Sequence, residues 1–234
     1  MNAETESQTA APTRVKICGI TRLEDARYCA AVGADYLGFI QHEESPRYVD
    51  PRTAKEIMEW SVGPEPVGVF VNREAQDVID TCAAAGFTHA QLHGHETPDT
   101  CAAVREAGLT VIKSIQVVSD AAAEQILAIA EPYRGSVDHL LLDTHHTSLW
   151  GGTGESFNWR LARQVAREWE LFLAGGISAE NVAEAIQTMR PFAIDLSSSL
   201  EESPGVKDFD KLADFFDAFR AALGTEGSGS PTSA

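Results

Sequence analysis

The chain has 234 residues, of which 44% are hydrophobic and 23% are charged, an ordinary balance for a globular protein with a substantial core. Its 35 acidic and 18 basic residues give a net charge of −17, so nucleic acid and anionic membrane surfaces are poor partners for it. No apolar run approaches the roughly 20 residues needed to span a bilayer.

The two ends of the chain have the composition of flexible tails. Residues 1–13 are small, polar and acidic, and they lack the basic and apolar regions of a signal peptide. Residues 224–234 are rich in Gly and Ser. We therefore expect one domain over residues 14–223, between a disordered acidic N-terminal tail and a flexible C-terminal tail, as a monomer or small homo-oligomer.

The cysteines and lysines give hints about the compartment. The cysteines form no CxxC pair and lack metal-finger spacing, which favours reduced thiols in a cytoplasm. An acidic surface with few lysines is tolerated where salt screens self-repulsion. One interpretation is a high-salt cytoplasm, and the alternative is an acidic surface that only serves solubility. The four cysteines are Cys18, Cys29, Cys82 and Cys101, and the five lysines are Lys16, Lys55, Lys113, Lys207 and Lys211.

The first element in the chain is a predicted strand, residues 14–20 (RVKICGI), which ends in a tight turn at Gly19. Side chains alternate across a strand, so Lys16 and Cys18 share one face. Cys18 lies at the C-terminal end of this strand, where parallel α/β folds place their chemistry. The alternative is that Cys18 is only a small buried hydrophobe.

A unit of helix, glycine and strand then recurs along the chain. Gly33, Gly86 and Gly108 each follow an alanine-rich segment and precede a β-rich run, as expected for left-handed caps that end helices. After the first strand, the predicted strands are 35–40, 67–72, 88–93, 109–115, 137–143, 171–174 and 192–197. The predicted helices include 51–60, one that Pro98 opens, one capped by Ser119 and Asp120 that runs to about Pro132, one capped by Ser178 that runs to Met189, and 208–223.

These elements predict an α/β fold with a single (β/α)8 TIM barrel, since eight strand–helix units occupy about 210 residues. The alternative is an open doubly wound sheet. That fold normally has a Gly-rich dinucleotide turn after its first strand, and residues 18–22 (CGITR) are not such a turn.

If the chain is a barrel, its function lies where strands pass into loops. Several of these positions are polar or rich in glycine, and they come from separate strands, which favours a shared site. They are Cys18, Gln41 with Ser45 and Arg47, Asn72, His93, Ser114, Asp143, residues 174–176 and residues 195–199.

The last two strand ends favour phosphate. Gly175 and Gly176 let backbone N–H groups approach an anion, and Ser197 and Ser198 follow the final strand. The loops after strands seven and eight commonly hold phosphate in these barrels. The alternative for either loop alone is a tight turn or a Ser-rich cap.

Asp143 and Arg47 are the charged candidates. A carboxyl at the end of an apolar strand can act as a general acid, although a cap or a loop salt bridge would also explain Asp143. The planar guanidinium of Arg47 suits a carboxylate, although it could instead pair with Glu43 or Glu44. Residues 150–154 (WGGTG) are either a lid over the substrate or a solvated turn.

Histidines near Asp143 raise the question of a metal. His93 and His95 form an HxH pair, and His145 and His146 follow Asp143. Only His93 has inward parity, because His95 lies in the loop beyond Gly94. We therefore expect no metal site.

The strand ends, in their order, resemble the phosphoribosylanthranilate isomerase family of tryptophan biosynthesis. The resemblance covers residues 14–223. The matching segments are 15–21 (VKICGIT), 33–40 (GADYLGFI), 45–49 (SPRYV), 67–72 (VGVFVN), 91–96 (QLHGHE), 140–144 (LLLDT), 151–154 (GGTG), 173–177 (LAGGI), 180–182 (ENV), 195–198 (DLSS) and 204–208 (PGVKD).

This resemblance implies an Amadori rearrangement of N-(5-phosphoribosyl)anthranilate to 1-(2-carboxyphenylamino)-1-deoxyribulose 5-phosphate, without a cofactor. It implies that Cys18 is the general base that takes the C2′ proton and that Asp143 is the general acid at the ring oxygen. A thiol near pKa 8.5 is mostly protonated at neutral pH. We therefore expect Lys16 or the cationic imine of the substrate to lower the pKa of Cys18.

The resemblance assigns substrate binding to other strand ends. Arg47 would hold the anthranilate carboxylate, Asp195 would lie on the ribose side, and His93 would line the site without an assigned role. The phosphate would rest on Gly175, Gly176, Ser197 and Ser198. Some residues depart from the family pattern, notably Ser199 where glycine is usual, which puts phosphate affinity in doubt rather than activity.

Two other functions stay open from the residues alone. One is a different phosphosugar barrel enzyme, such as an epimerase or synthase, although an epimerase of that type would need clear metal ligands. The other is a barrel that binds phosphosugars without catalysis, against which the presence of both Cys18 and Asp143 argues. A second aminoaldose substrate is also left open.

The charge balance makes a prediction about salt. If the surface is adapted to high salt, the melting temperature rises between dilute buffer and molar KCl, because screening reduces repulsion among the acidic groups. Differential scanning fluorimetry measures this shift. Chloride is the right anion, because sulfate strengthens hydrophobic burial by another route. A melting temperature that does not rise counts against the high-salt interpretation.

Overall fold

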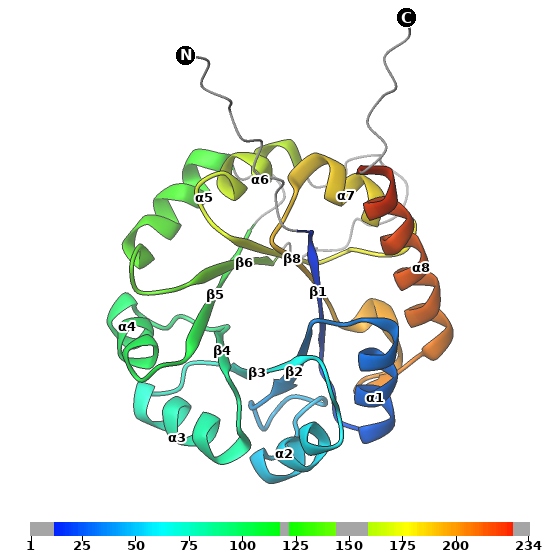
Figure 1. The fold of residues 1–234 in the computed structure, drawn as a ribbon. Helices are drawn as coiled ribbons and strands as arrows, with labels where there is room; N and C mark the ends of the chain where they lie inside the picture. Colours follow the sequence, from blue (N-terminus) through cyan, green and yellow to red (C-terminus); the bar gives the residue numbers. More distant parts are fainter. Residues whose placement is uncertain (1–11, 118–121, 144–158, 227–234) are drawn as a thin grey trace, which may run out of the picture.

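The eight predicted strands close into a parallel barrel with the helices on its outer side, as the computed structural model shows (Figure 1). The structure describes residues 12–117, 122–143 and 159–226. The barrel strands are β1 (Arg14–Cys18), β2 (Tyr36–Ile40), β3 (Glu65–Phe70), β4 (His89–Leu92), β5 (Thr110–Gln116), β6 (His139–Asp143), β7 (Leu171–Ala174) and β8 (Ala193–Leu196).

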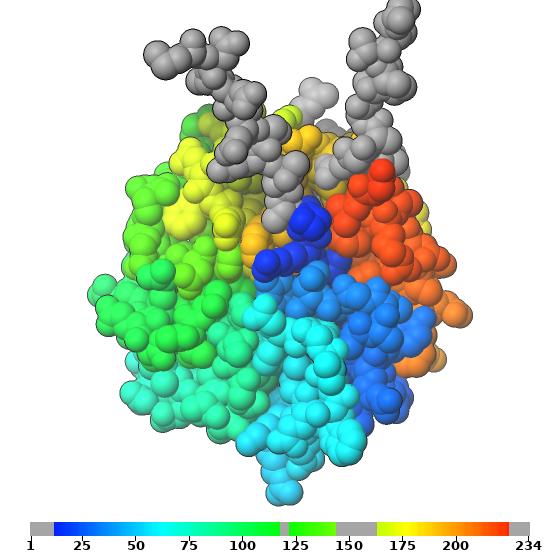
Figure 2. Space-filling model, in the orientation of Figure 1, coloured from blue at the N-terminus to red at the C-terminus, as the bar shows by residue number. Residues whose placement is uncertain are grey.

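Each strand pairs with the next, and β1 pairs with β8 to close the sheet. The outer helices are α1 (Leu23–Val32), α2 (Pro51–Glu59), α3 (Ala75–Ala85), α4 (Pro98–Glu106), α5 (Ala123–Ala130), α6 (Trp159–Ala166), α7 (Val182–Met189) and α8 (Phe209–Glu226). In Figure 2 the colours follow one another around the molecule, so that α8 in red lies beside α1 in blue. The TIM-barrel prediction is therefore confirmed.

Glycine ends the helices where it was predicted to do so. Gly33 and Gly86 are the C-caps of α1 and α3, with φ of 103° and 76°. Gly108, with φ of 91°, follows the end of α4. A left-handed residue ends a helix without steric cost only when it is glycine, so these positions turn the chain back toward the sheet.

Two predictions about local structure need correction. Ser178 does not cap α7, which begins at Val182 after Asn181. The side chain of Asn181 accepts a hydrogen bond from the backbone N–H of Ser178 instead. The chain also forms a short antiparallel pair that was not predicted, β9 (Glu201–Ser203) and β10 (Val206–Lys207). The predicted caps Ser119 and Asp120, and residues 1–11 and 227–234 of the predicted tails, lie outside the described residues.

The last helix, predicted over 208–223, buries one apolar face against the barrel. Leu212, Phe215, Phe216 and Phe219 of α8 are buried against the barrel. Phe209 is 39% exposed and instead stacks on the ring of Tyr28, with centroids 4.3 Å apart. Within the described residues no helix is long and apolar enough to cross a membrane.

Large rings fill the end of the barrel at which the strands begin. The ring of His139 stacks on Phe192 at 4.5 Å between centroids, and Tyr36 lies against His89 and Phe172 at 5.3 Å and 5.6 Å. Further along the axis, inward-facing Val67, Ile112 and Leu141 are fully buried. The filled interior leaves the opposite end, where the strands finish, for a cavity.

A buried ion pair fastens the loop between β4 and α4 to the outer face of β5. Nζ of Lys113 lies 3.0 Å from Oε2 of Glu96, and both side chains are at most 3% exposed. The same ammonium donates to the carbonyls of Leu92 and Gly94. The backbone N–H of Asn72 also donates to Glu96, so this carboxylate joins two strand ends.

We predict that Lys113→Met lowers the free energy of unfolding by about 3–5 kcal/mol, because it leaves the Glu96 carboxylate buried without its cation. Urea denaturation followed by circular dichroism measures the change. The matched control is Arg52→Met, which breaks an exposed pair with Glu56 and should cost less than about 1 kcal/mol. Equal effects of the two substitutions would mean that burial adds nothing to the cost of breaking the Lys113–Glu96 pair.

Candidate active site

A cavity of about 640 Å³ opens at the end of the barrel where the strands finish. All nine predicted site residues line it, although they come from strands spread around the sheet. They are Cys18, Arg47, His93, Asp143, Gly175, Gly176, Asp195, Ser197 and Ser198. Gln91 and Ser199 are also in the wall. Most of the strand ends picked out from the sequence therefore come together in one place, but Gln41, Asn72 and Ser114, which were picked out with them, are not among the residues that line the cavity.

Cys18 ends β1 with its side chain inside the barrel and only 7% of the residue exposed. Its strand neighbour in β2 is Gly38. A Cβ on Gly38 would lie 2.8 Å from Sγ of Cys18 and 3.2 Å from Nζ of Lys16. Position 38 therefore accommodates only glycine, because any side chain would displace the thiol.

Burial raises the pKa of the Cys18 thiol, even though the charge of Lys16 opposes this shift. Lys16 acts in the expected direction, but the expectation of a net lowering of the pKa of Cys18 is wrong for the free protein. The cation is present, but the loss of water around the thiol outweighs it. The neutral thiol is therefore the resting form.

Lys16 itself is completely buried and was not predicted as a site residue. Its Nζ donates to Oδ1 of Asp195 at 2.8 Å, between neighbouring positions of β1 and β8. Burial alone would lower the pKa of Lys16, but its interactions with Asp195 and Cys18 together outweigh this and the pKa is raised. The inward parity of Lys16 on a predicted inner strand was the signal that could have identified it.

Asp143 and His93 face each other across the cavity wall. Nε2 of His93 lies 3.6 Å from Oδ2 of Asp143, and Nδ1 of His93 is 2.9 Å from Nε2 of Gln91. When the amide of Gln91 donates to Nδ1, the proton of neutral His93 is on Nε2 and points to Asp143. Burial lowers the pKa of His93. At neutral pH the histidine is therefore a neutral neighbour of the carboxyl group.

The loop after β7 presents its backbone to the cavity. Gly175 and Gly176 have φ of 88° and 63°, a conformation that places the chain close to a bound group without side-chain interference. The side-chain amide of Asn181 donates to the carbonyl of Gly176 at 2.8 Å and holds this loop in place. Ser197, Ser198 and Ser199 form the adjoining wall after β8.

Arg47 pairs with an acid that is distant in sequence. Its Nε and Nη2 donate to the carboxylate of Glu201 at 2.9 Å and 2.6 Å. Glu43 and Glu44, which precede it in the chain, were the partners considered from sequence. Glu201 was not predicted, because it lies in the unpredicted β9–β10 pair.

The histidines and acids around the cavity do not gather as metal ligands in the part of the chain that the structure describes. Among those residues, no group of three or more His, Cys, Asp or Glu side chains could hold a metal ion. His145, His146 and the predicted lid, residues 150–154, lie outside the described ranges.

Comparison with known proteins identifies the family. Residues 15–218 match the family model described as N-(5'phosphoribosyl)anthranilate (PRA) isomerase. The chain belongs to this family. An N-(5'-phosphoribosyl)anthranilate isomerase of Gloeothece citriformis is 40% identical over 207 residues, which cover 87% of this chain and 92% of the relative.

Solved structures of PRA isomerases agree with the fold. The enzyme of Thermotoga maritima has a TM-score of 0.79 and 37% identity, over 89% of this chain and 99% of that one. A PRA isomerase in complex with reduced 1-(o-carboxyphenylamino)-1-deoxyribulose 5-phosphate has a TM-score of 0.77 and 36% identity with the same coverage. The protein is therefore a PRA isomerase, an enzyme of tryptophan biosynthesis.

The raised pKa of Cys18 predicts how the thiol reacts in the PRA isomerase without substrate. The rate of alkylation by iodoacetamide should keep rising with pH beyond the ordinary thiol value near 8.5, because burial favours the unreactive neutral form. Mass spectrometry of the labelled peptides measures the rate at each pH.

The other cysteines are internal controls. Burial raises the pKa of Cys29 and Cys82 to about 12 and that of Cys101 to about 11, and none of the three lines the cavity. They should be labelled far more slowly than Cys18. A midpoint for Cys18 below 8.5 would contradict the effect of burial.

Proposed function

We propose that the PRA isomerase reaction in this chain is an Amadori rearrangement in which Asp143 is the general acid and Cys18 the general base. The observation that supports this most strongly is that both groups open into one cavity, from β6 and β1. In the closed sheet, β7 and β8 lie between those two strands. The proposed phosphate loops therefore separate the acid from the base.

The proposed steps need only proton transfers. Asp143 donates a proton to the furanose ring oxygen as the bond from C1′ to that oxygen breaks, which leaves a cationic imine at C1′. Cys18 then removes the proton from C2′, and the electrons of that bond neutralise the imine to give an enolamine. Tautomerisation returns a proton to C1′ and produces the ketone. No electron leaves the substrate, so no redox cofactor is required.

The resting thiol of Cys18 must become a thiolate for the second step. The thiol proton passes to solvent, and the cationic imine stabilises the resulting thiolate when it forms, since a positive charge beside the sulfur favours the ionised form. The ammonium of Lys16 already acts on the pKa of the thiol in the same direction. The base is thus activated by the product of the first step, so proton abstraction follows ring opening.

The remaining site residues bind separate parts of the substrate. Arg47 binds the anthranilate carboxylate through its planar guanidinium, and Asp195 binds on the ribose side. Gly175, Gly176, Ser197 and Ser198 hold the phosphate. His93 lines the site against Asp143, which its contact at 3.6 Å supports.

The proposed ligand is a small phosphorylated aminosugar. The state of the cysteines supports a reducing compartment. All four cysteines are free. Free thiols persist in a cytoplasm, where we propose that the enzyme works as a monomer or small homo-oligomer.

We predict that Cys18→Ala and Asp143→Asn each reduce kcat by at least about 10²- to 10⁴-fold, because each removes one proton-transfer group. Binding of the reduced product analogue, measured by isothermal titration calorimetry, should survive in both variants. A steady-state fluorescence assay with substrate generated in place measures turnover. The matched control is Cys82→Ala, a buried cysteine of the outer core. Near wild-type rates in both site variants would overturn the assignment of roles.

A further inference from the structure

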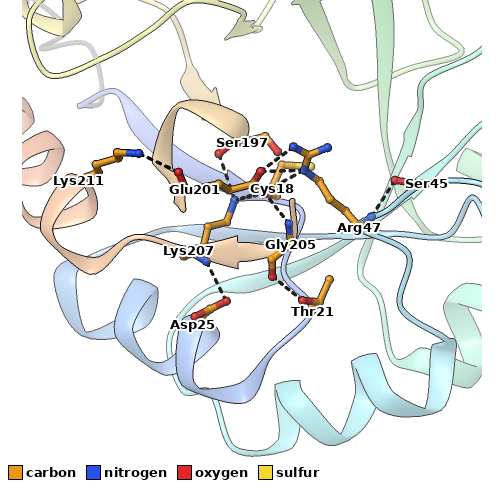
Figure 3. A network of polar contacts seen from close by, with 10 residues as sticks. All are labelled: Cys18, Thr21, Asp25, Ser45, Arg47, Ser197, Glu201, Gly205, Lys207 and Lys211. Carbon is orange, nitrogen blue, oxygen red and sulfur yellow. Dashed lines mark hydrogen bonds and ion pairs between the residues drawn. The ribbon is translucent and has the colours of Figure 1, made fainter. Parts of the chain in front are cut away.

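A chain of buried charges connects Arg47 to the backbone at Cys18. The carboxylate of Glu201 lies between the guanidinium of Arg47 and the ammonium of Lys207 (Figure 3). Its distances to the nearest nitrogen atoms are 2.6 Å to Nη2 of Arg47 and 3.1 Å to Nζ of Lys207. The side chain of Glu201 is only 4% exposed, and that of Lys207 is not exposed at all.

Lys207 bonds to two strand ends of the site at once. Its Nζ donates to the carbonyl of Cys18 at 2.7 Å and to the carbonyl of Ser197 at 3.2 Å. These carbonyls belong to the residue proposed as the base and to the loop proposed to hold phosphate. One ammonium therefore sets the spacing between the ends of β1 and β8.

Glu201 fixes one edge of the Arg47 guanidinium. Arg47 donates to this carboxylate through both Nε and Nη2, so the plane of the guanidinium is held. A guanidinium has five N–H donors, and three remain beyond those two. Nη1 and the second hydrogen of Nη2 form the edge that can bind a substrate carboxylate in the same bidentate manner. The side chain of Arg47 is 21% exposed and lines the cavity.

Gly19 provides the space for this arrangement. It follows Cys18 with φ of 79°, and a Cβ there would lie 2.8 Å from Cδ of Arg47 and 3.4 Å from Oε1 of Glu201. Burial alone would raise the pKa of Glu201, but Arg47 and Lys207 outweigh it and the pKa is lowered. The group is therefore a carboxylate, and the pairing depends on its charge.

We propose that Glu201 and Lys207 are positioning residues for the isomerase reaction. Glu201 orients Arg47 for the carboxylate of the substrate, and Lys207 holds the base and the phosphate loop at a set distance. The inference rests on the proposed function, because it requires Arg47 to bind that carboxylate. The β9–β10 pair, which contributes no residue to the cavity wall, would then have a function in positioning the site.

The first test is Glu201→Gln, which keeps the shape of the side chain but removes its charge. We expect KM to rise about 10- to 100-fold while kcat changes by less than about fivefold, since the orientation of Arg47 affects binding of the carboxylate and not the proton transfers. Two competitive probes separate the halves of the site. The inhibition constant of anthranilate should rise at least about tenfold, and that of inorganic phosphate should stay within about twofold.

A double-mutant cycle with Arg47→Met distinguishes failure of this inference from failure of the proposed function. If Arg47→Met leaves KM and anthranilate inhibition unchanged, Arg47 does not bind the carboxylate and the proposed function of Arg47 is wrong. If Arg47→Met weakens both but Glu201→Gln weakens neither, Glu201 has no positioning role. If Glu201 acts through Arg47, Glu201→Gln should raise KM and the inhibition constant of anthranilate by less than about a further twofold in the Arg47→Met background.

Glu201→Asp tests the same point if the glutamine variant does not fold. It keeps the charge but is one methylene shorter, so it should weaken anthranilate inhibition by a smaller factor and leave phosphate inhibition unchanged. Lys207→Met should instead lower kcat and weaken both probes, and Lys207→Arg should restore part of each. The control is Lys211→Met, which removes an exposed side chain bonded to the backbone carbonyl of Glu201. If the control matches Glu201→Gln, or if phosphate and anthranilate inhibition weaken equally in Glu201→Gln, the inference is wrong.

Discussion

The ion pair between Lys16 and Asp195 joins the first and last strands of the barrel, and Asp195 lines the cavity. Desolvation of two buried charges offsets most of their attraction, so such a pair adds little net stability. Removing either partner would leave the other charge buried without its counter-ion. The pair therefore fixes how β1 and β8 meet, and the positions of Cys18 and Ser197 at the ends of these strands follow from that register.

This pairing continues outward into the Arg47–Glu201–Lys207 network. Lys207 bonds to the carbonyls of Cys18 and Ser197. Cys18 lies two residues after Lys16 on β1, and Ser197 lies two residues after Asp195, just beyond the end of β8. Two groups of charged residues thus hold β1 and β8 together. The Lys16–Asp195 pair lies inside the barrel, and the Arg47–Glu201–Lys207 network lies at the ends of the strands. In a barrel, the last and first strands are joined only by contacts between residues far apart in sequence. Here the Lys16–Asp195 and Arg47–Glu201 ion pairs both join residues far apart in sequence.

The barrel was predictable because its signals are local. Alternation along β1 placed Lys16 and Cys18 correctly on one face, and Gly33 and Gly86 mark helix ends because of their backbone freedom. The strand ends carry the site, so the order of elements was enough to find many of its lining residues, although not Gln91. The cap at Ser178 was wrong because its hydroxyl donates to the carboxylate of Glu180 instead of accepting from the backbone, and α7 begins only at Val182. Such competition is decided by geometry that residue type does not specify.

The partners of the site residues were not predictable in this way. Arg47 and Glu201 are 154 positions apart, and Lys207 and Cys18 are 189 apart. Nearby acids such as Glu43 are equally plausible from the sequence. The direction of the pKa shift of Cys18 was missed for a related reason. Lys16 was visible as a neighbouring cation, but the degree of burial, which outweighs it, depends on the whole barrel.

The distribution of charge explains how a protein with a net charge of −17 can bind a substrate that carries both a phosphate and a carboxylate. The long-range field of the surface repels such an anion, but salt screens that field within about 10 Å at 0.1 M. Around the cavity, Lys16, Arg47 and Lys207 lie in a poorly solvated region, where screening is weak. These cations are paired with the buried carboxylates of Asp195 and Glu201, and of the three only Arg47 lines the cavity. The cavity wall therefore presents the oriented hydrogen-bond donors of Arg47 more than a net positive charge. We therefore expect selectivity for the anion to depend on the geometry of the rim more than on the net charge of the surface.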